Sequence, residues 1–172
     1  MNPAVRGRRL ASPVRLALAA ELGSAVDGAW WPHTSSIAAE LPELVGALSA
    51  RLGEIVDISV NWSSLESSPD LDALNRVRVG DAGRVVGRQR LMVVVGSRAC
   101  ANLLVVPCRT SATLATMVLR QAAALPVARV ERDSQEFRTG ADIMRAACTE
   151  SASSGQRWPD DRGAPAEAAV TD

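Results

Sequence analysis

The fold is decided by residues 91–106, LMVVVGSRACANLLVV, in which two continuous apolar runs flank a short polar connection. The runs, Leu91–Val95 and Leu103–Val106, have the length and β-branched content of buried strands. The connection from Gly96 to Asn102 is of hairpin length and predicts an antiparallel pair. Because neither run alternates with polar residues, both faces of this hairpin must be covered.

Three further segments are expected to be strands: two carry the two-residue period of half-buried strands, and the middle one is a short extended piece. They are residues 14–19, residues 26–31 and residues 54–62, of which the last has the most regular alternation. Its apolar residues are expected to share the buried face: Val56, Ile58, Val60 and Trp62. Residues 76–79 are a candidate edge strand within the segment 63–90, which shows no other clear pattern.

Three segments place apolar residues at helical spacing. The first covers residues 35–52, with Thr34 or Ser35 as its cap, and Pro42 is expected to kink or break it. The second follows Thr110 or Ser111 and ends before Pro126, and the third opens at the capping-box sequence of residues 133–136. The expected buried faces are Ile37, Leu41, Leu44, Val45, Leu48 and Leu52; Leu114, Met117, Val118, Ala122 and Leu125; and Phe137, Ala141, Met144 and Cys148.

These elements predict an α+β domain over residues 14–150. It should contain a mixed, mostly antiparallel sheet of about five strands, with three helices packed mainly on one face. Residues 1–13 are expected to form a flexible basic arm and residues 151–172 a disordered tail. The hairpin face away from the helices would need its own cover. A second subunit and the segment 63–90 folded back onto the sheet are equal alternatives.

Charge and composition exclude several classes of protein. The 172 residues include 19 basic residues, all of them Arg, and 19 acidic ones, so the formal net charge is zero. No overall field therefore attracts nucleic acid or an anionic membrane. The apolar run near the N-terminus stops at Glu21, too early for a secretory signal, and no run is long enough for a membrane span. We therefore expect a cytoplasmic protein.

The cysteines and the single histidine limit the chemistry further. Cys100, Cys108 and Cys148 lack C-x-x-C spacing. Eight residues of strand would hold the first two about 26 Å apart, beyond the disulfide limit of about 7 Å. Buried structural thiols are the simplest interpretation, and a redox or catalytic thiol is the alternative. Because His33 is the only histidine, a two-His metal site cannot form within the chain, and we expect no metal and no cofactor.

The densest group of chemically useful residues is DGAWWPHT, residues 27–34. Asp27, Trp30, Trp31 and His33, joined by Trp62, could form a ligand pocket or a contact surface with a proton acceptor. Adjacent tryptophans on a strand point to opposite faces, so a purely structural role is the competing interpretation.

Arginines concentrate in residues 76–98, whereas acidic residues concentrate in residues 40–72. This asymmetry suits self-association through complementary patches, or the binding of a small anion. The candidate anion-binding residues are Arg76, Arg78, Arg84, Arg88 and Arg90. No aromatic residue is interleaved among them, which argues against nucleic-acid binding, and a solvated basic face is the simpler interpretation.

The string DGAWWPHT, the helical segment 35–52 and EIVDISVNWSS at residues 54–64 resemble an actinobacterial family, number 5994 in the domain-of-unknown-function series. Residues 88–107, RQRLMVVVGSRACANLLVVP, and the helical segment 110–125 are similar to its mycobacterial members. The resemblance covers about residues 14–150 and implies a small cytoplasmic protein. It implies no activity, cofactor or catalytic residue. Many members of the family have Arg at the position of His33, which weakens any mechanism that requires this histidine.

We therefore expect a non-enzymatic binding or regulatory module that self-associates and uses the Trp30–Trp31 segment as a ligand pocket or contact surface. The alternative is a small hydrolase or transferase that uses His33 with Asp27, or Cys108, although no G-x-S-x-G nucleophile elbow is present. A weaker alternative is an anion or nucleic-acid binder that acts through residues 6–9 and 76–90.

Overall fold

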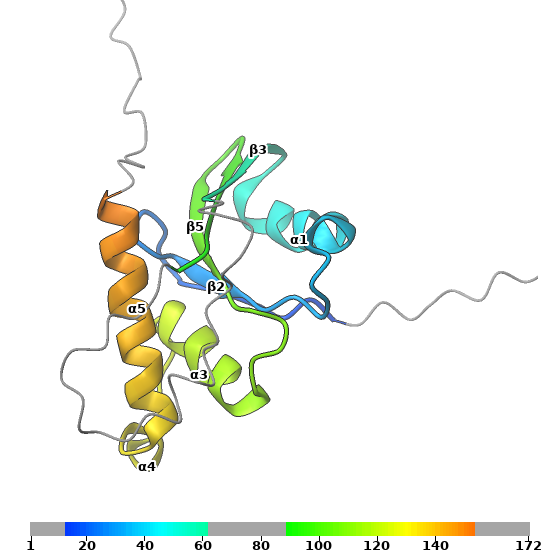
Figure 1. Cartoon of the computed structure of the whole chain (residues 1–172). Coiled ribbons are helices and arrows are strands. Elements are labelled where there is room, and N and C mark those ends of the chain that lie inside the picture. The colour runs from blue at the N-terminus through cyan, green and yellow to red at the C-terminus, as the bar shows by residue number, and fades with distance from the viewer. Residues whose placement is uncertain (1–12, 62–88, 154–172) are drawn as a thin grey trace, which may run out of the picture.

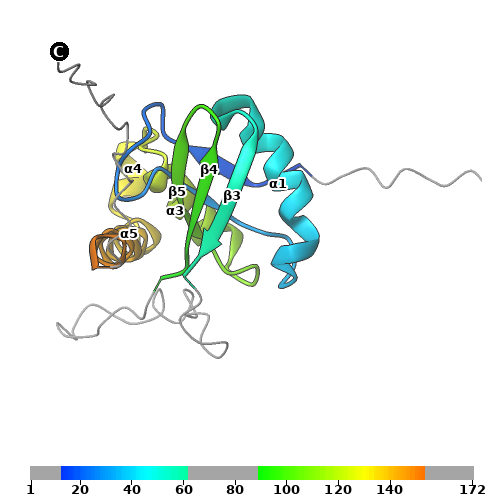
Figure 2. The same ribbon diagram turned by 90° about the horizontal axis from the view of Figure 1, so that it is seen from above.

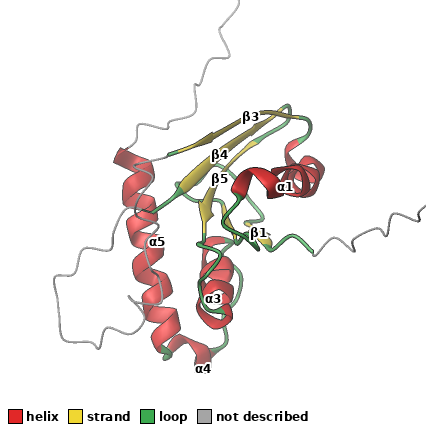
Figure 3. Cartoon of the chain, turned by 45° about the vertical axis from the view of Figure 1, so that its right-hand side comes forward, coloured by secondary structure: helices red, strands yellow, loops and turns green. Residues whose placement is uncertain are grey.

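The computed structural model describes residues 13–61 and 89–153. Its sheet has five strands in the order β1-β2-β5-β4-β3. The strands are β1 (Leu16–Leu18), β2 (Gly28–Trp30), β3 (Ile55–Val60), β4 (Leu91–Gly96) and β5 (Cys100–Val105). β2 runs parallel to β5, and the other neighbouring pairs are antiparallel. The predicted mixed, mostly antiparallel sheet is confirmed, and β4 and β5 form the predicted hairpin (Figure 3).

The described helices are α1 (Ile37–Leu52), α3 (Ala112–Ala122), α4 (Arg129–Arg132) and α5 (Gln135–Ser153). The three long ones confirm the predicted α+β class, and the short α4 was not predicted. Two of the long helices, α3 and α5, lie together on one side of the sheet, whereas α1 lies on the other (Figures 1 and 2). α5 continues past the predicted domain end at residue 150. None of the described helices has both the length and the apolar character to cross a lipid bilayer.

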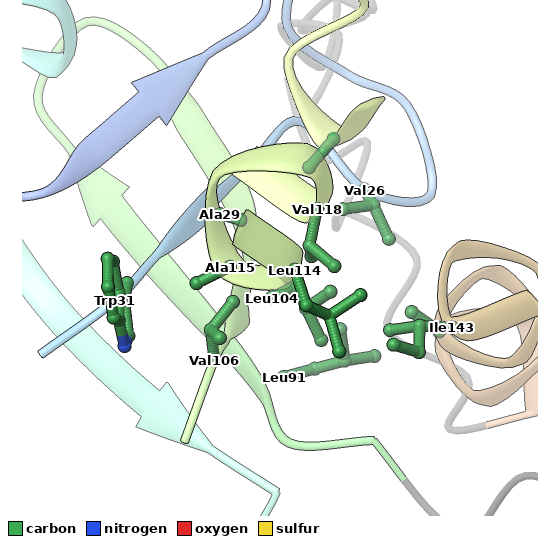
Figure 4. Packing of buried hydrophobic residues seen from close by; sticks show 12 residues of the cluster. Val26, Ala29, Trp31, Leu91, Leu104, Val106, Leu114, Ala115, Val118 and Ile143 are labelled. Atoms are coloured by element: carbon green, nitrogen blue, oxygen red, sulfur yellow. The ribbon is translucent and has the colours of Figure 1, made fainter. Parts of the chain in front are cut away.

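The sheet separates two apolar cores. One core lies between the sheet and α1, and its largest buried side chains are Trp30, Leu44, Leu48, Leu52, Met92 and Leu103. The other lies beneath α3 and α5, and Figure 4 shows the side chains of Leu91, Leu104, Val106, Leu114, Val118 and Ile143 meeting there. The prediction that the β4–β5 hairpin is covered on both faces is therefore confirmed.

α1 covers the second face of the hairpin, so neither cover considered from the sequence is needed to complete that core. Most of the segment 63–90 lies outside the described residues, so its position stays a prediction, as does a second subunit. The prediction treated the connections between strands as hairpins. The parallel pairing of β2 with β5 instead requires a crossover between them. α1 lies in this crossover and packs on the face opposite α3.

α1 runs through Pro42 without a break. Of the two predicted outcomes, a kink or a break, the break is therefore wrong, and the kink stays a prediction. A proline inside a helix loses one backbone hydrogen bond and crowds the preceding turn. Here Pro42 is exposed, while Leu44, Leu48 and Leu52 on the opposite side are fully buried against the sheet. Their burial stabilises the helix by several kcal/mol, at about 1.5–3 kcal/mol for each leucine, which outweighs the cost of the proline of about 3 kcal/mol.

A β-bulge changes the predicted face of β3. Ile55 pairs with Gly96 and Asp57 pairs with Val95, so Val56 is an extra residue with no partner. Val56 is therefore 71% exposed instead of buried. Downstream of the bulge the expected alternation returns, and Ile58 and Val60 pack against the core beneath α1.

The buried face of α5 is rotated from the predicted one. The fully buried residues are Thr139, Gly140, Ile143, Ala147 and Ser151, whereas Phe137, Ala141, Met144 and Cys148 are half-buried on its flank. A Cβ atom at Gly140 would lie only 2.8 Å from Oε1 of Gln121 on α3, so the missing side chain allows the two helices to approach closely. Apolar periodicity does not detect a contact that is built from small residues.

Leu125 is 47% exposed and does not extend the buried face of α3, as was predicted. The helix ends at Ala122, and Ala124 adopts a positive φ of 52°. This left-handed residue turns the chain away from the core before Leu125.

Candidate ligand-binding site

Asp27 lies at the start of β2, where its carboxylate is 1% exposed and bound to backbone amides. Oδ1 accepts hydrogen bonds from the amides of Gly23 at 2.8 Å and Ser24 at 2.7 Å. Oδ2 accepts a hydrogen bond from the amide of Asn102 on β5 at 2.9 Å. Asp27 thus fixes the loop before β2 against the neighbouring strand, which is a structural role.

His33 lies beyond the other end of β2. Its ring is exposed, and Nε2 lies 3.2 Å from the carbonyl oxygen of Pro13. A strand rises about 3.3 Å per residue, and the whole of β2 separates His33 from Asp27. The structure therefore does not bring together the two members of the predicted acid–base pair.

Trp30 and Trp31 point to opposite faces of the sheet, as the structural interpretation required. Trp30 is 1% exposed and belongs entirely to the core beneath α1. Trp31 is 9% exposed and lies at the edge of the other core. Figure 4 shows it beside Val106, with its ring nitrogen turned away from Ala29. Of the two tryptophans, Trp31 is therefore the one whose ring packs at the edge of a core.

Glu40 fixes the loop that contains His33. Its carboxylate accepts hydrogen bonds from the amide of His33 at 2.8 Å, and from the amide and hydroxyl of Thr34 at 2.6 and 2.7 Å. Partial burial alone would raise the pKa of Glu40, but these hydrogen bonds outweigh it and hold the pKa below its usual value. The predicted cap Thr34 contributes by accepting a hydrogen bond from the amide of Ser36.

Arg15, which directly precedes β1 next to β2, covers the indole ring of Trp31. Its Cζ atom lies 3.5 Å from the ring centroid, a cation–π geometry, and its Nε donates to the carbonyl oxygen of Trp31 at 3.0 Å. Burial lowers the pKa of Arg15, while the nearby charges of Glu40 and Cys108 act in the opposite direction. Arg15 therefore carries a cationic group to the place where β2 ends.

The parallel strands β2 and β5 end at the same edge of the sheet. From this edge the chain after β2 continues through residues 31–36 to α1, and the chain after β5 continues through residues 106–111 to α3. The two helices lie on opposite faces, so the two connections diverge. In open sheets with parallel strands, such points of divergence are the usual position of ligand sites. We call the residues Arg15, Trp31, Cys108, Arg109 and Thr110 the switch edge.

Two buried polar side-chain atoms at the switch edge lack hydrogen-bond partners among the described residues. They are Nε1 of Trp31 and Oγ1 of Thr110. Trp31 as a whole is 9% exposed and Thr110 is 6% exposed. Trp31 packs with Val106 and with Ala115 of the first turn of α3, and Thr110 belongs to the connection between these two residues. Buried polar groups without partners are rare in proteins, and each requires an explanation.

The N-terminus of α3 opens onto the same edge. Ser111 is its N-cap residue but provides no side-chain capping hydrogen bond, and the first turn of the helix contains no acidic residue. Helix N-termini carry a partial positive charge that acidic or capping side chains ordinarily offset. The exposed Arg109 lies just before this helix. The electrostatic character of the edge is positive, with Glu40 as the opposing charge on Arg15.

All three cysteines are free thiols, in agreement with the prediction that Cys100 and Cys108 do not pair. Burial raises the pKa of the Cys100 thiol, which disfavours the reactive thiolate there. Cys108 is half-buried at the switch edge. Within residues 13–61 and 89–153, no three His, Cys, Asp or Glu side chains gather as a metal site would need.

Several predicted site residues lie outside the described residues: Trp62, Arg76, Arg78, Arg84 and Arg88, together with residues 6–9. Of the predicted anion-binding arginines, Arg90 is described. It directly precedes β4 and accepts a hydrogen bond from the amide of Val105 through its carbonyl oxygen. The role of its side chain in anion binding stays a prediction.

Arg15 and Thr110 were missed as site residues by sequence reasoning. Arg15 was counted among the basic N-terminal residues, and Thr110 was considered only as a helix cap. The register of β1 on β2 pairs Leu16 with Trp30 and so places Arg15 opposite Trp31. This signal becomes visible only after the two strands are paired.

The fold and the switch edge define a small α+β domain in which a single pair of parallel strands interrupts an antiparallel sheet and ends in unpaired polar groups. The chain belongs to the DUF5994 family, a family of unknown function whose sequence model matches residues 15–122. The matched range includes the whole sheet, α1, α3 and the switch edge, and ends before α4 and α5. Neither a curated protein nor a solved structure matches the chain.

Proposed function

We propose that this protein is a non-enzymatic binding module that takes a small ligand at the switch edge. The observation that supports the proposal most directly is the pair of buried, unpartnered atoms, Trp31 Nε1 and Thr110 Oγ1. Leaving such a group unpaired costs about 1–3 kcal/mol, so a fold gains stability by removing it unless the group has another role. Donors held in place for a ligand are one such role.

The positions of the other candidate residues support binding over catalysis. Both carboxylate oxygens of Asp27 accept hydrogen bonds from backbone amides, and His33 lies beyond the far end of β2. Cys108 shares the switch edge with Trp31, and its role as a nucleophile stays a prediction. The proposed module therefore holds its ligand with polar groups that have no proton-transfer partner among the described residues.

Self-association stays part of the expectation without new support. One of its two grounds was the need to cover a second apolar face of the β4–β5 hairpin, and α1 meets that need. The other ground is the opposite charge of residues 40–72 and 76–98. Light scattering at tens of micromolar protein tests it directly, and a clean monomer would contradict it.

A comparison of fragment binding to matched variants tests the proposed function. The wild-type chain and the double variant Trp31→Phe, Thr110→Val are screened by ligand-observed NMR against a mixed library of neutral and charged fragments. The double variant keeps an aromatic ring at position 31, although a smaller one, and the side-chain shape at position 110, but it loses both polar groups. Thr116→Val, on the exposed side of α3, is the control.

We expect fragments that bind the wild-type chain and the Thr116→Val variant but not the double variant. Fragments that bind all three proteins equally would place binding elsewhere and contradict the proposal. Circular dichroism of each variant checks that the fold is retained.

A further inference from the structure

We infer that the ligand of the switch edge is an oxyanion, a carboxylate or phosphate group, bound by Trp31 Nε1, Thr110 Oγ1 and the N-terminus of α3. This inference rests on the proposed function and specifies the chemical class of the ligand. The two side chains are each more than nine-tenths buried, and neither polar atom has a partner among the described residues.

The polarity of the unpaired atoms selects an acceptor. An indole nitrogen can only donate a hydrogen bond, and a hydroxyl can donate one while it accepts another. The group that joins Trp31 to Thr110 must therefore present at least one lone pair and has no need of a proton. Carboxylate and phosphate oxygens meet this requirement with several lone pairs at one centre.

The charge around these donors selects an anion over a neutral acceptor. α3 has 11 residues, no acidic residue in its first turn and no side-chain cap, so its N-terminal amides and dipole favour negative charge. Arg15 lies over the ring of Trp31, and Arg109 is exposed in the connection before the helix. The negative charge of Glu40, which acts on Arg15, is already engaged by the amides of residues 33 and 34.

The hydrophobic surroundings limit the size of the anion. Trp31 packs in the core with Val106, Leu114 and Ala115, so the donors lie against apolar side chains. A single oxyanion group fits this mixture of donors and apolar walls, whereas an extended polyanion would need a row of exposed cations.

Indole N–H resonances provide the test. The ¹⁵N-labelled full chain has four tryptophans, and the Trp31→Phe variant assigns the Trp31 signal. Inorganic phosphate, acetate and neutral acetamide are titrated separately at constant ionic strength, with sodium chloride as the control salt. We expect a saturable downfield shift of the Trp31 signal with phosphate or acetate, and no such shift with acetamide or chloride.

The variants sharpen the result. Thr110→Val should weaken the anion about tenfold, whereas Thr110→Ser, which keeps the hydroxyl, and Thr116→Val should bind as the wild type does. Response to phosphate alone would assign a phosphoryl ligand, and response to acetate alone a carboxylate ligand. A Trp31 shift with acetamide alone, or an equal shift with chloride, would overturn the oxyanion assignment while the proposed function stands. No saturable shift with any probe would overturn the oxyanion assignment, whereas the fragment screen decides the proposed function separately.

Discussion

Replacing Thr110 by valine should stabilise the ligand-free protein. Valine has nearly the same shape as threonine, and Thr110 is 6% exposed with an unpartnered hydroxyl. Removal of that hydroxyl relieves a desolvation cost of about 1–3 kcal/mol. The methyl group that replaces it adds an apolar burial of about 0.8 kcal/mol. Allowing for incomplete relaxation, we expect the free energy of unfolding to rise by about 1–3 kcal/mol.

Urea denaturation followed by tryptophan fluorescence measures this change, with Thr116→Val as the control. Thr116 is exposed on α3, so its replacement should change the free energy of unfolding by less than about 0.5 kcal/mol. If the Thr110 hydroxyl were instead satisfied in the ligand-free protein, its loss would destabilise the fold by about 0.5–1.5 kcal/mol. A destabilised Thr110→Val variant would thus refute the reasoning on which the binding site depends.

Three further predictions concern other parts of the structure. Gly96→Ala would drive a Cβ atom into the backbone of Leu52, so we expect the free energy of unfolding in urea to fall by more than about 2 kcal/mol. Gly46→Ala is the control: a Cβ atom there meets nothing, so the free energy of unfolding should stay the same or rise by up to about 1 kcal/mol. In Asp27→Asn one of the two accepting oxygens is replaced by an amide nitrogen, so the free energy of unfolding should fall by about 2–3 kcal/mol. An unchanged unfolding midpoint would contradict the structural role of this carboxylate. The folded-state pKa of Glu40 lies below its usual 4.5, so its contribution is present above that pH and disappears as the pH falls through the lower folded value. The NMR signals of the two amides that donate to Glu40, those of His33 and Thr34, should shift over this acidic range in the wild type but not in Glu40→Gln. Identical pH profiles in the two proteins would exclude the carboxylate as the cause.

The sequence predicts those parts of the fold in which apolar periodicity and burial coincide. The runs at residues 91–106 and the leucines of α1 lie where the pattern indicates, because each contributes a large side chain to a core. Prediction fails where packing depends on small residues or on one inserted residue. Gly140 lets α5 approach α3, and the bulge at Val56 turns an apolar residue to solvent. Neither feature alters the hydrophobic pattern enough to be read from the sequence.

The candidate site is harder to predict than the fold, because its members come together only through strand pairing. The sequence singles out the segment 27–34 as a candidate site, but the structure divides it. Asp27 and Trp30 serve the fold, while Trp31 contacts Arg15, which precedes β1, and lies beside Val106, which follows β5 (Figure 4). The parallel pairing of β2 with β5 brings the end of β2 to the connection that contains Thr110, and parallel partners far apart in sequence leave no local signal.

The two proposals meet in the balance between stability and binding at Thr110. A ligand that binds only the folded state raises the free energy of unfolding by about 2.7 kcal/mol at a hundred times its dissociation constant. The Thr110→Val variant should therefore be the more stable protein without anion, while its tenfold weaker binding removes about 1.4 kcal/mol of that gain at the same anion concentration. The difference in unfolding midpoint between the two proteins should then shrink steadily as phosphate or acetate is added at constant ionic strength. If Thr110→Val is more stable than the wild type by the same amount with and without the anion, Thr110 is only an imperfectly packed residue. That result would contradict ligand binding at the switch edge.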